Sequence, residues 1–169
     1  SGGYAYYKDG VLTLHDYSYT GAGCAVGTEG DSALILTNKN LKLSLMGTNT
    51  LMASGSSKVY GIQVTEGSSL TIEQSGTGTL MVKDAYCGIY VKGDITLNSG
   101  SVTIDNILQD GILTWGNLTI KGGKLDVDSR VRGISLGSHG KTVSIEGGEV
   151  KIVADGHGIL TNLNNCAVE

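Results

Sequence analysis

The chain has 169 residues and a formal net charge of −4, with 27 Gly, eight Tyr, one Trp, no Pro and no Phe. Its 12 Lys and Arg residues are thinly spread, so the basic stripe typical of nucleic-acid binding is missing and no nucleic-acid partner is expected. No apolar run approaches the roughly 18 residues of a membrane span. The three Cys residues are too far apart for a zinc motif or a disulfide framework.

The first predicted elements lie in residues 10–21, "GVLTLHDYSYTG", where alternating apolar and polar residues predict two short strands. Residues 21–31 follow, and their Gly, Thr and Asp content predicts an inserted surface loop. A further strand is expected at Ala33-Leu34. These residues would form the first winding of a repeat.

The pair Gly-Ile then recurs along the rest of the chain. Its members are Gly61-Ile62, Gly88-Ile89, Gly111-Ile112, Gly133-Ile134 and Gly158-Ile159, with Ala33-Leu34 as a degenerate first member. Counted from Ala33, the steps are 28, 27, 23, 22 and 25 residues. A period near 25 residues is typical of a solenoid.

Each period also contains two apolar-polar-apolar triplets separated by a Gly-marked turn, as in "LTIKGGKLDV" at residues 118–127. The turns are too short for a crossover helix, so each period predicts three short strands that stack on those of the next period, about 4.8 Å away. The sequence therefore predicts an all-β fold: one parallel β-helix of about six coils over residues 1–169. Residues 164–169 would form a C-terminal tail or the start of a cap.

Several segments resemble a known group of proteins. They are "YAYYKDGVLTLHDYSYTGAG", "LKLSLMGTNTL", "YGIQVTEGSSLTI", "GTGTLMV" and "YCGIYVKGDITLNSGSVTI". Together they are similar to the repeat-rich, right-handed β-helix regions of Firmicutes surface proteins, some of which are described as carbohydrate-binding and share a fold with pectate lyases. The resemblance implies a right-handed solenoid in an exported protein. It lies in scaffold residues, so it implies less about activity.

Outward positions of the third strand form the most unusual predicted surface. In successive coils they read Ile35, Gln63, Tyr90, Leu113, Ser135 and Leu160, with Trp115 just beyond Leu113. Exposed apolar surface of this kind usually has a use. Tyr90, Leu113 and Trp115 are therefore candidate ligand-binding residues, forming a flat platform on which a sugar ring stacks. Alternatively, a neighbouring domain or the segment with Tyr4, Tyr6 and Tyr7 covers this face.

The residues that precede each Gly-Ile pair form a second candidate group. Asp110, Arg132 and His157 occupy this place in consecutive coils, where they could contact a uronic acid, with Arg132 holding its carboxylate. The alternative is that Asp110 and Arg132 pair with each other while His157 lies near Asp155.

A candidate metal site lies on the second strand. Asp105, Asp126 and Asp128 would be near neighbours, and carboxylate oxygens are the ligands that Ca²⁺ prefers. Alternatively, Lys83 and Lys151 neutralise these carboxylates by cross-strand ion pairs. Apart from Ca²⁺, no cofactor is expected.

These features predict a non-catalytic extracellular or cell-surface module that binds a polysaccharide along one face of the β-helix. Two alternatives stay open: a pectate-lyase-like polysaccharide lyase or hydrolase, and a spacer without a ligand. The expected partners are a polysaccharide and other domains of a larger surface protein. No membrane span is expected in the chain.

Overall fold

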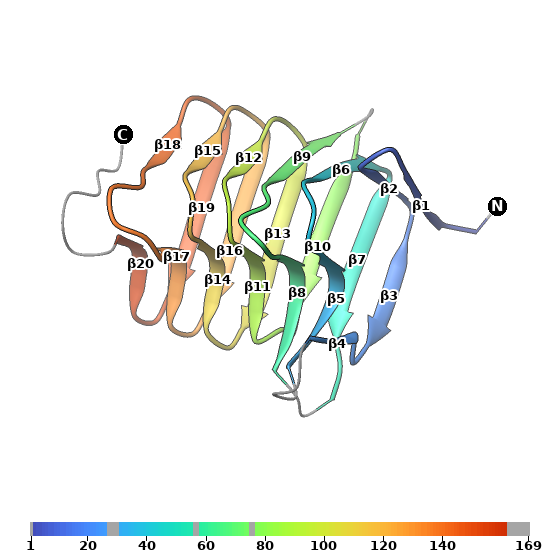
Figure 1. Cartoon of the computed structure of the whole chain (residues 1–169), viewed down its shortest axis with the longest axis horizontal. Helices are drawn as coiled ribbons and strands as arrows, with labels where there is room; N and C mark the ends of the chain where they lie inside the picture. The colour runs from blue at the N-terminus through green and yellow to red at the C-terminus, as the bar shows by residue number, and fades with distance from the viewer. Residues whose placement is uncertain (1, 27–30, 56–57, 75–76, 162–169) are drawn as a thin grey trace.

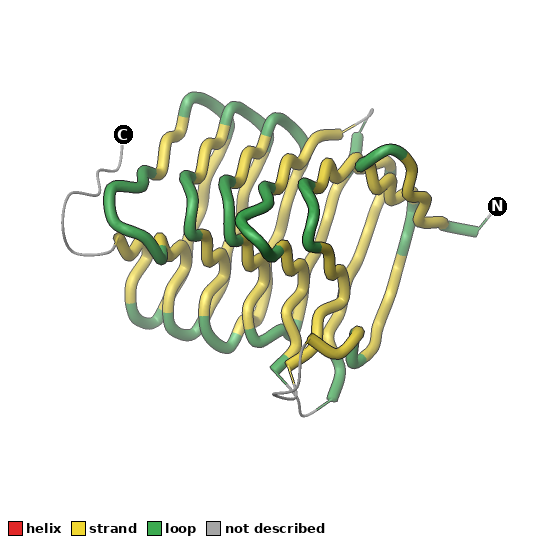
Figure 2. The backbone as a smooth tube through the Cα atoms, viewed as in Figure 1, coloured by secondary structure: helices red, strands yellow, loops and turns green. Residues whose placement is uncertain are grey.

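The computed structural model describes residues 2–26, 31–55, 58–74 and 77–161, which form strands and turns and contain no helix (Figures 1 and 2). Accordingly, nothing in these ranges is a helix long and apolar enough to cross a membrane. The strands stack into three sheets, called A, B and C in the order in which the chain visits them.

The strands of sheet A are β1 (Tyr4–Lys8), β2 (Val11–His15), β6 (Leu41–Met46), β9 (Leu70–Gln74), β12 (Ile95–Leu97), β15 (Leu118–Ile120) and β18 (Val143–Ile145). Those of sheet B are β3 (Ser18–Gly21), β7 (Thr48–Ala53), β10 (Thr79–Lys83), β13 (Ser101–Ile107), β16 (Lys124–Ser129) and β19 (Glu149–Ala154). Those of sheet C are β4 (Cys24–Val26), β5 (Asp31–Thr37), β8 (Val59–Val64), β11 (Cys87–Val91), β14 (Asp110–Thr114), β17 (Arg132–Leu136) and β20 (His157–Thr161).

The predicted β-solenoid is confirmed. From β2 onward the chain passes through sheets A, B and C in turn and makes about five turns, and apart from β1 and β4 all strands pair in parallel. In Figure 1 the chain rises through sheets C and A at the front, descends through sheet B at the back and advances from the N-terminal to the C-terminal end. This makes the winding right-handed.

The core consists of inward-facing residues that stack from one winding to the next. In sheet A, for example, Leu43, Ile72, Leu97 and Ile120 are register partners, and each is at most 3% exposed. The apolar residues of each triplet therefore point inward, as strand alternation requires. The next member of this column, Ile145 in the last winding, is 39% exposed.

The Gly of each Gly-Ile pair is required by close packing. A Cβ on Gly111 would lie 2.7 Å from the Gly133 carbonyl oxygen and would also clash with the Val127 side chain. Gly61, Gly88 and Gly133 face the same two obstacles in their own windings. At Gly158, in the last winding, no described residue lies within 4 Å of such a Cβ.

Polar side chains connect consecutive windings at the corner between sheets C and A. The acceptors are Asn40 Oδ1, Ser69 Oγ, Asp94 Oδ1 and Asn117 Oδ1, and each accepts a hydrogen bond from the backbone N–H at the matching corner of the next winding. The distances run from 2.7 to 3.2 Å. This ladder satisfies backbone donors that the sheets leave without a partner.

Two antiparallel strands lie at the N-terminal end, and the sequence did not indicate them. β1 pairs with β2 at the edge of sheet A, and β4 pairs with β5 at the edge of sheet C. β4 falls within residues 21–31, the predicted inserted loop. Residues 27–30 of that segment and residues 164–169, the predicted tail or cap, lie outside the described residues.

The register of the first winding corrects one prediction. Ala33 is opposite Tyr60 and Ile35 is opposite Ile62, so Leu34-Ile35 correspond to Gly61-Ile62 and the degenerate pair is shifted by one residue. Consequently Leu36, not Ile35, precedes Gln63 in the outward column. Residues 33–36 are all apolar, so their pattern cannot determine which of them face inward; the hydrogen-bond register does.

Candidate functional site

The outer face of sheet C contains the predicted platform residues. Tyr90 is the register partner of both Gln63 and Leu113, and Leu113 is the partner of Ser135. Trp115 directly follows β14, and its backbone N–H donates to the Val91 carbonyl at 3.0 Å. Tyr90, Leu113 and Trp115 are therefore brought to one face, as predicted from the repeat.

Trp115 is held between its neighbours in the adjacent windings. Lys92, one winding earlier, places its Nζ 4.1 Å from the centroid of the indole. Gly137, one winding later, lies so close that a Cβ there would be 2.9 Å from the ring. The indole is still 38% exposed. Trp115 is thus packed between its neighbours and exposes part of its surface to solvent, but neither face of the indole ring is fully exposed.

Two further tyrosines extend this surface toward the N-terminal end. Tyr60 packs edge-on against Tyr90 and Tyr86, with ring centroids 5.5 and 6.0 Å apart. Lys58 lies 5.4 Å from the Tyr86 ring, and Lys92 lies 5.5 Å from the Tyr90 ring. We call this group the aromatic strip: Tyr60, Tyr86, Tyr90 and Trp115 with Lys58 and Lys92.

The environment of Tyr60 changes its ionisation. Burial is the main cause that raises the pKa of the Tyr60 hydroxyl from 10.0 to about 12, and the nearby Asp31 carboxylate adds to the effect. Tyr60 therefore keeps its proton to a higher pH than an ordinary tyrosine and acts as a packing group with a hydroxyl that can donate.

Asp110 and Arg132 form an ion pair next to the strip. Arg132 Nε lies 2.8 Å from Asp110 Oδ1, and Nη2 donates to Oδ2 at 2.9 Å. The Asp110 side chain is 5% exposed and that of Arg132 33%, and the Ser135 hydroxyl also donates to Asp110. Asp110 and Arg132 therefore pair with each other in the structure.

His157 and Cys87 occupy the same column as this ion pair. His157 is the register partner of Arg132 and is exposed, and the ion pairs of the described residues do not join it to Asp155. Cys87, one winding before Asp110, is buried, and burial raises the pKa of its thiol, with the Asp110 carboxylate as the second cause. The thiol is consequently a packing group and not a reactive thiolate.

A hollow of about 240 Å³ opens beside the ion pair. Leu113 and Leu160 supply apolar walls, Arg132 and Ser135 supply polar groups, and Gly137 connects the hollow to the base of Trp115. A cavity with apolar walls and a few fixed polar groups suits a small polar ligand with an apolar face.

The predicted calcium ligands are not gathered into one group. Lys83 pairs with Asp105 at 3.2 Å, and Lys151 lies 3.8 Å from Asp126. The register of β13 against β16 is irregular between Ile104 and Ile107, and Asp128 is opposite Val153 in the next winding. Across the described residues, no three His, Cys, Asp or Glu side chains form a group that could hold a metal ion.

The tyrosines near the N-terminus do not cover the aromatic strip. Tyr4, Tyr6 and Tyr7 belong to β1, which lies at the edge of sheet A. All three are about half exposed. The predicted covering role is therefore wrong, because β1 pairs antiparallel with β2 and does not cross to sheet C.

Comparison with known proteins connects this arrangement to a family. The model of a family described as "carbohydrate-binding domain-containing protein" matches residues 22–167. The chain belongs to this family. No curated protein and no solved structure matched the chain significantly.

The family match covers the aromatic strip and the hollow and agrees with the carbohydrate-binding part of the predicted resemblance. Sequence reasoning found Trp115, Tyr90 and Arg132 but missed Tyr60, Tyr86 and Lys92. A signal was available, since Tyr60 precedes a Gly-Ile pair and Tyr86 precedes Cys87, so both lie near the start of a sheet C strand.

Proposed function

We propose that this member of the family is a non-catalytic module that binds a polysaccharide along the outer face of sheet C. We further propose that it acts outside the cell or at the cell surface, as part of a larger surface protein. The observation that carries the proposal is the supported, partly exposed Trp115 beside a hollow with fixed polar groups.

The chemistry of the face suits a sugar. The exposed part of Trp115 and the Leu113 side chain provide apolar contact for the C–H groups of a pyranose ring, and Lys92 and Arg132 provide polar groups for its hydroxyls. Because Lys92 lies over the indole, we expect the sugar to contact Lys92 and the exposed part of the ring together. Successive windings repeat about every 4.8 Å, so an extended chain could contact several of them.

The ion pair supports binding over catalysis. General acid–base catalysis needs a carboxylate that can exchange protons with the substrate. Asp110 is buried and engaged by Arg132 and Ser135, so it serves as a structural carboxylate that orients the guanidinium. This favours the binding module over the lyase or hydrolase alternative.

Affinity electrophoresis tests the proposal, using gels that contain soluble polysaccharides with the wild type, Trp115→Ala and Met81→Ala. Met81 is a matched control because it is also 38% exposed but lies on the outer face of sheet B. We expect at least one polysaccharide to retard the wild type, and Trp115→Ala to weaken that binding about tenfold or more, as for an interface anchor. Met81→Ala should bind like the wild type.

Three results would contradict the proposal. Equal retardation of Trp115→Ala and the wild type would remove the sheet C face as the binding surface. Free migration of the wild type through every gel would favour the spacer alternative, and release of oligosaccharide products would favour the enzyme.

A further inference from the structure

A second group of exposed aromatic residues lies far from the aromatic strip, on β1. Tyr4, Tyr6 and Tyr7 are 49%, 56% and 57% exposed. They are the most exposed aromatic side chains in the described ranges. Exposed tyrosines in such number are a common feature of binding surfaces.

The register of β1 divides these tyrosines between two faces. Tyr6 is opposite Thr13, Tyr4 is opposite His15, and Tyr7 is opposite Leu12. Leu12 packs against the core and Leu14 is buried, so Thr13 and His15 point outward. Tyr4 and Tyr6 therefore share the outer face of sheet A, about 7 Å apart along the strand, while Tyr7 is on the inner side.

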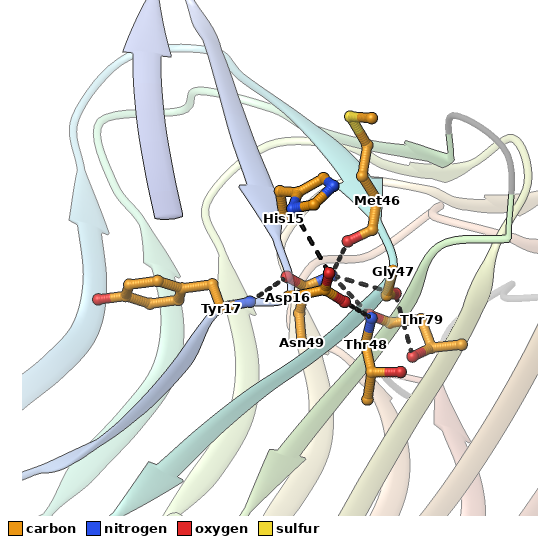
Figure 3. Close-up of polar contacts among 8 residues, drawn as sticks. All are labelled: His15, Asp16, Tyr17, Met46, Gly47, Thr48, Asn49 and Thr79. Carbon is orange, nitrogen blue, oxygen red and sulfur yellow. Dashed lines mark hydrogen bonds and ion pairs between the residues drawn. The ribbon is translucent and has the colours of Figure 1, made fainter. Parts of the chain in front are cut away.

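A partly exposed polar network lies at the base of Tyr4. The Tyr4 ring stacks on His15 with centroids 5.1 Å apart and planes 8° from parallel. His15 Nδ1 lies 3.5 Å from Asp16 Oδ2, and Asp16 Oδ1 accepts the Thr48 N–H at 2.9 Å (Figure 3).

Asn49 anchors the same corner. Its side chain is fully buried, accepts from the Tyr17 N–H and donates to the carbonyls of Met46 and Thr79, each at 2.9–3.1 Å (Figure 3). Tyr4 therefore stands on a fixed corner through His15. A ligand that contacts Tyr4 would restrict the protein little further, so the entropy cost of binding there would be small.

A hollow lined by both polar and apolar residues lies on the same face, at the start of β2. It measures about 360 Å³, and Asp9, Asn40, Lys42, Ser69 and Thr71 contribute to its lining. Asp9 and Gly10 both have positive φ, 50° and 82°, as in a tight two-residue hairpin turn between β1 and β2. That turn places Asp9 on the same hollow as Asn40 and Ser69, at the corners before β6 and β9, and Thr71 of β9.

The charges around the hollow indicate an uncharged ligand. Lys42 Nζ lies 2.9 Å from Glu73 Oε1, so its charge is largely neutralised within the protein. The other charged residue of the lining is Asp9. Its carboxylate would repel an anionic sugar and would accept hydrogen bonds from sugar hydroxyl groups.

We infer that the outer face of sheet A, with Tyr4, Tyr6 and the adjoining hollow, is a second carbohydrate-binding surface that takes an uncharged, hydroxyl-rich glycan. The inference rests on the proposed function, because that function makes a sugar the relevant ligand. The two surfaces lie on different sheets, so one module would contact a polysaccharide at two places.

The experiment uses the full chain in five forms: wild type, Tyr6→Ala, Trp115→Ala, Trp115→Ala with Tyr6→Ala, and Trp115→Ala with Tyr7→Ala. Tyr7 is the matched control, since it lies on the same strand with the same exposure but on the opposite side. The probes are neutral β-glucan, mannan and xylan, with polygalacturonate as the anionic comparison, in affinity gels. Circular dichroism verifies that each variant is folded.

We expect Trp115→Ala to retain part of the binding to a neutral glycan. Tyr6→Ala in that background should weaken the remaining binding about fivefold or more, and Tyr7→Ala should not. Polygalacturonate should be bound more weakly than the neutral glycan by Trp115→Ala.

Three outcomes would overturn the inference. If Trp115→Ala alone abolishes all binding while Tyr6→Ala binds like the wild type, the second surface fails and the proposed function survives. If Tyr6→Ala and Tyr7→Ala weaken the residual binding equally, the tyrosines act only through folding. If the wild type binds none of the probes, the proposed function fails and the inference fails with it.

Discussion

Asn49 illustrates how single residues position the surfaces of this solenoid. Its amide replaces missing backbone partners in two windings, connecting Tyr17 and Thr79, which are 62 positions apart in the chain. A buried amide with partners on both sides is stabilising, whereas one left without them would cost about 1–3 kcal/mol per unpaired group. No local pattern identifies this role, because the partners meet only when the coil closes.

Trp115 shows a similar dependence on neighbours. Its position beyond Leu113 was predictable, but the coverage of the ring by Lys92 was not. Lys92 is 23 residues away in sequence and one winding away in space. The predicted flat platform thus becomes a combined aromatic and cationic contact surface.

The raised pKa of Tyr60 leads to a prediction at the residue scale. Between pH 10 and 12 the unfolded chain releases the Tyr60 proton while the folded chain retains it. The unfolded state then binds fewer protons, so the free energy of unfolding falls as pH rises through this range. Thermal unfolding at pH 9 to 12 should show a smaller loss of stability for Tyr60→Phe than for the wild type. If the wild type and Tyr60→Phe lost stability equally over this pH range, the raised pKa of Tyr60 would be contradicted.

At the scale of elements, the Gly-Ile repeat marks where sheets B and C come closest. The Gly residues leave room for the carbonyl of the next winding and for a β-branched side chain of sheet B. The repeat was predictable because this geometry recurs in every winding. Two features of the register were not predictable: the alignment of the first winding with the second, and the irregular pairing between Ile104 and Ile107. Hydrogen-bond register decides both, and the apolar pattern does not reveal it.

This packing predicts different costs for the same substitution at two positions. Gly111→Ala should lower the free energy of unfolding by about 2 kcal/mol or more, because the added methyl group overpacks a closed corner. Gly158→Ala should change it by less than about 0.5 kcal/mol, since no described residue lies near that position. Urea denaturation measures both. If both variants were destabilised equally, close packing around Gly111 would not be the cause of the destabilisation.

At the scale of the whole molecule, the two ends of the solenoid differ. β1 and β4 pair antiparallel at the N-terminal end, where Leu14 is buried but Leu12 and Ile35 of the first winding are only partly buried. In the last winding the inward residues Val150, Ile152 and Ile159 are only partly buried, whereas Ile104 and Ile112 in a central winding are at most 2% exposed. Because each winding contacts mainly its neighbours, stability should vary along the axis.

Hydrogen exchange tests this gradient. Amides of β19 and β20 should exchange at least about tenfold faster than those of β13 and β14, since local opening of the last winding exposes less apolar surface. Uniform exchange rates along the axis would show instead that the solenoid opens as one cooperative unit.

The sequence by itself determined the architecture of this protein. A Gly-Ile pair every 22–27 residues and two alternating triplets between the pairs are enough to specify three stacked sheets, because the same local geometry is needed in every winding. It also located Tyr90, Leu113, Trp115 and the column with Asp110 and Arg132.

Only the tertiary structure decided what those residues touch. Lys92 lies over Trp115, Asp110 is held by Arg132 and Ser135, and the Asp residues of sheet B are divided among separate partners. The N-terminal tyrosines, expected over sheet C, lie on sheet A. These contacts join residues 20 or more positions apart, and their geometry depends on register, bulges and antiparallel edge strands, which leave no periodic mark on the sequence.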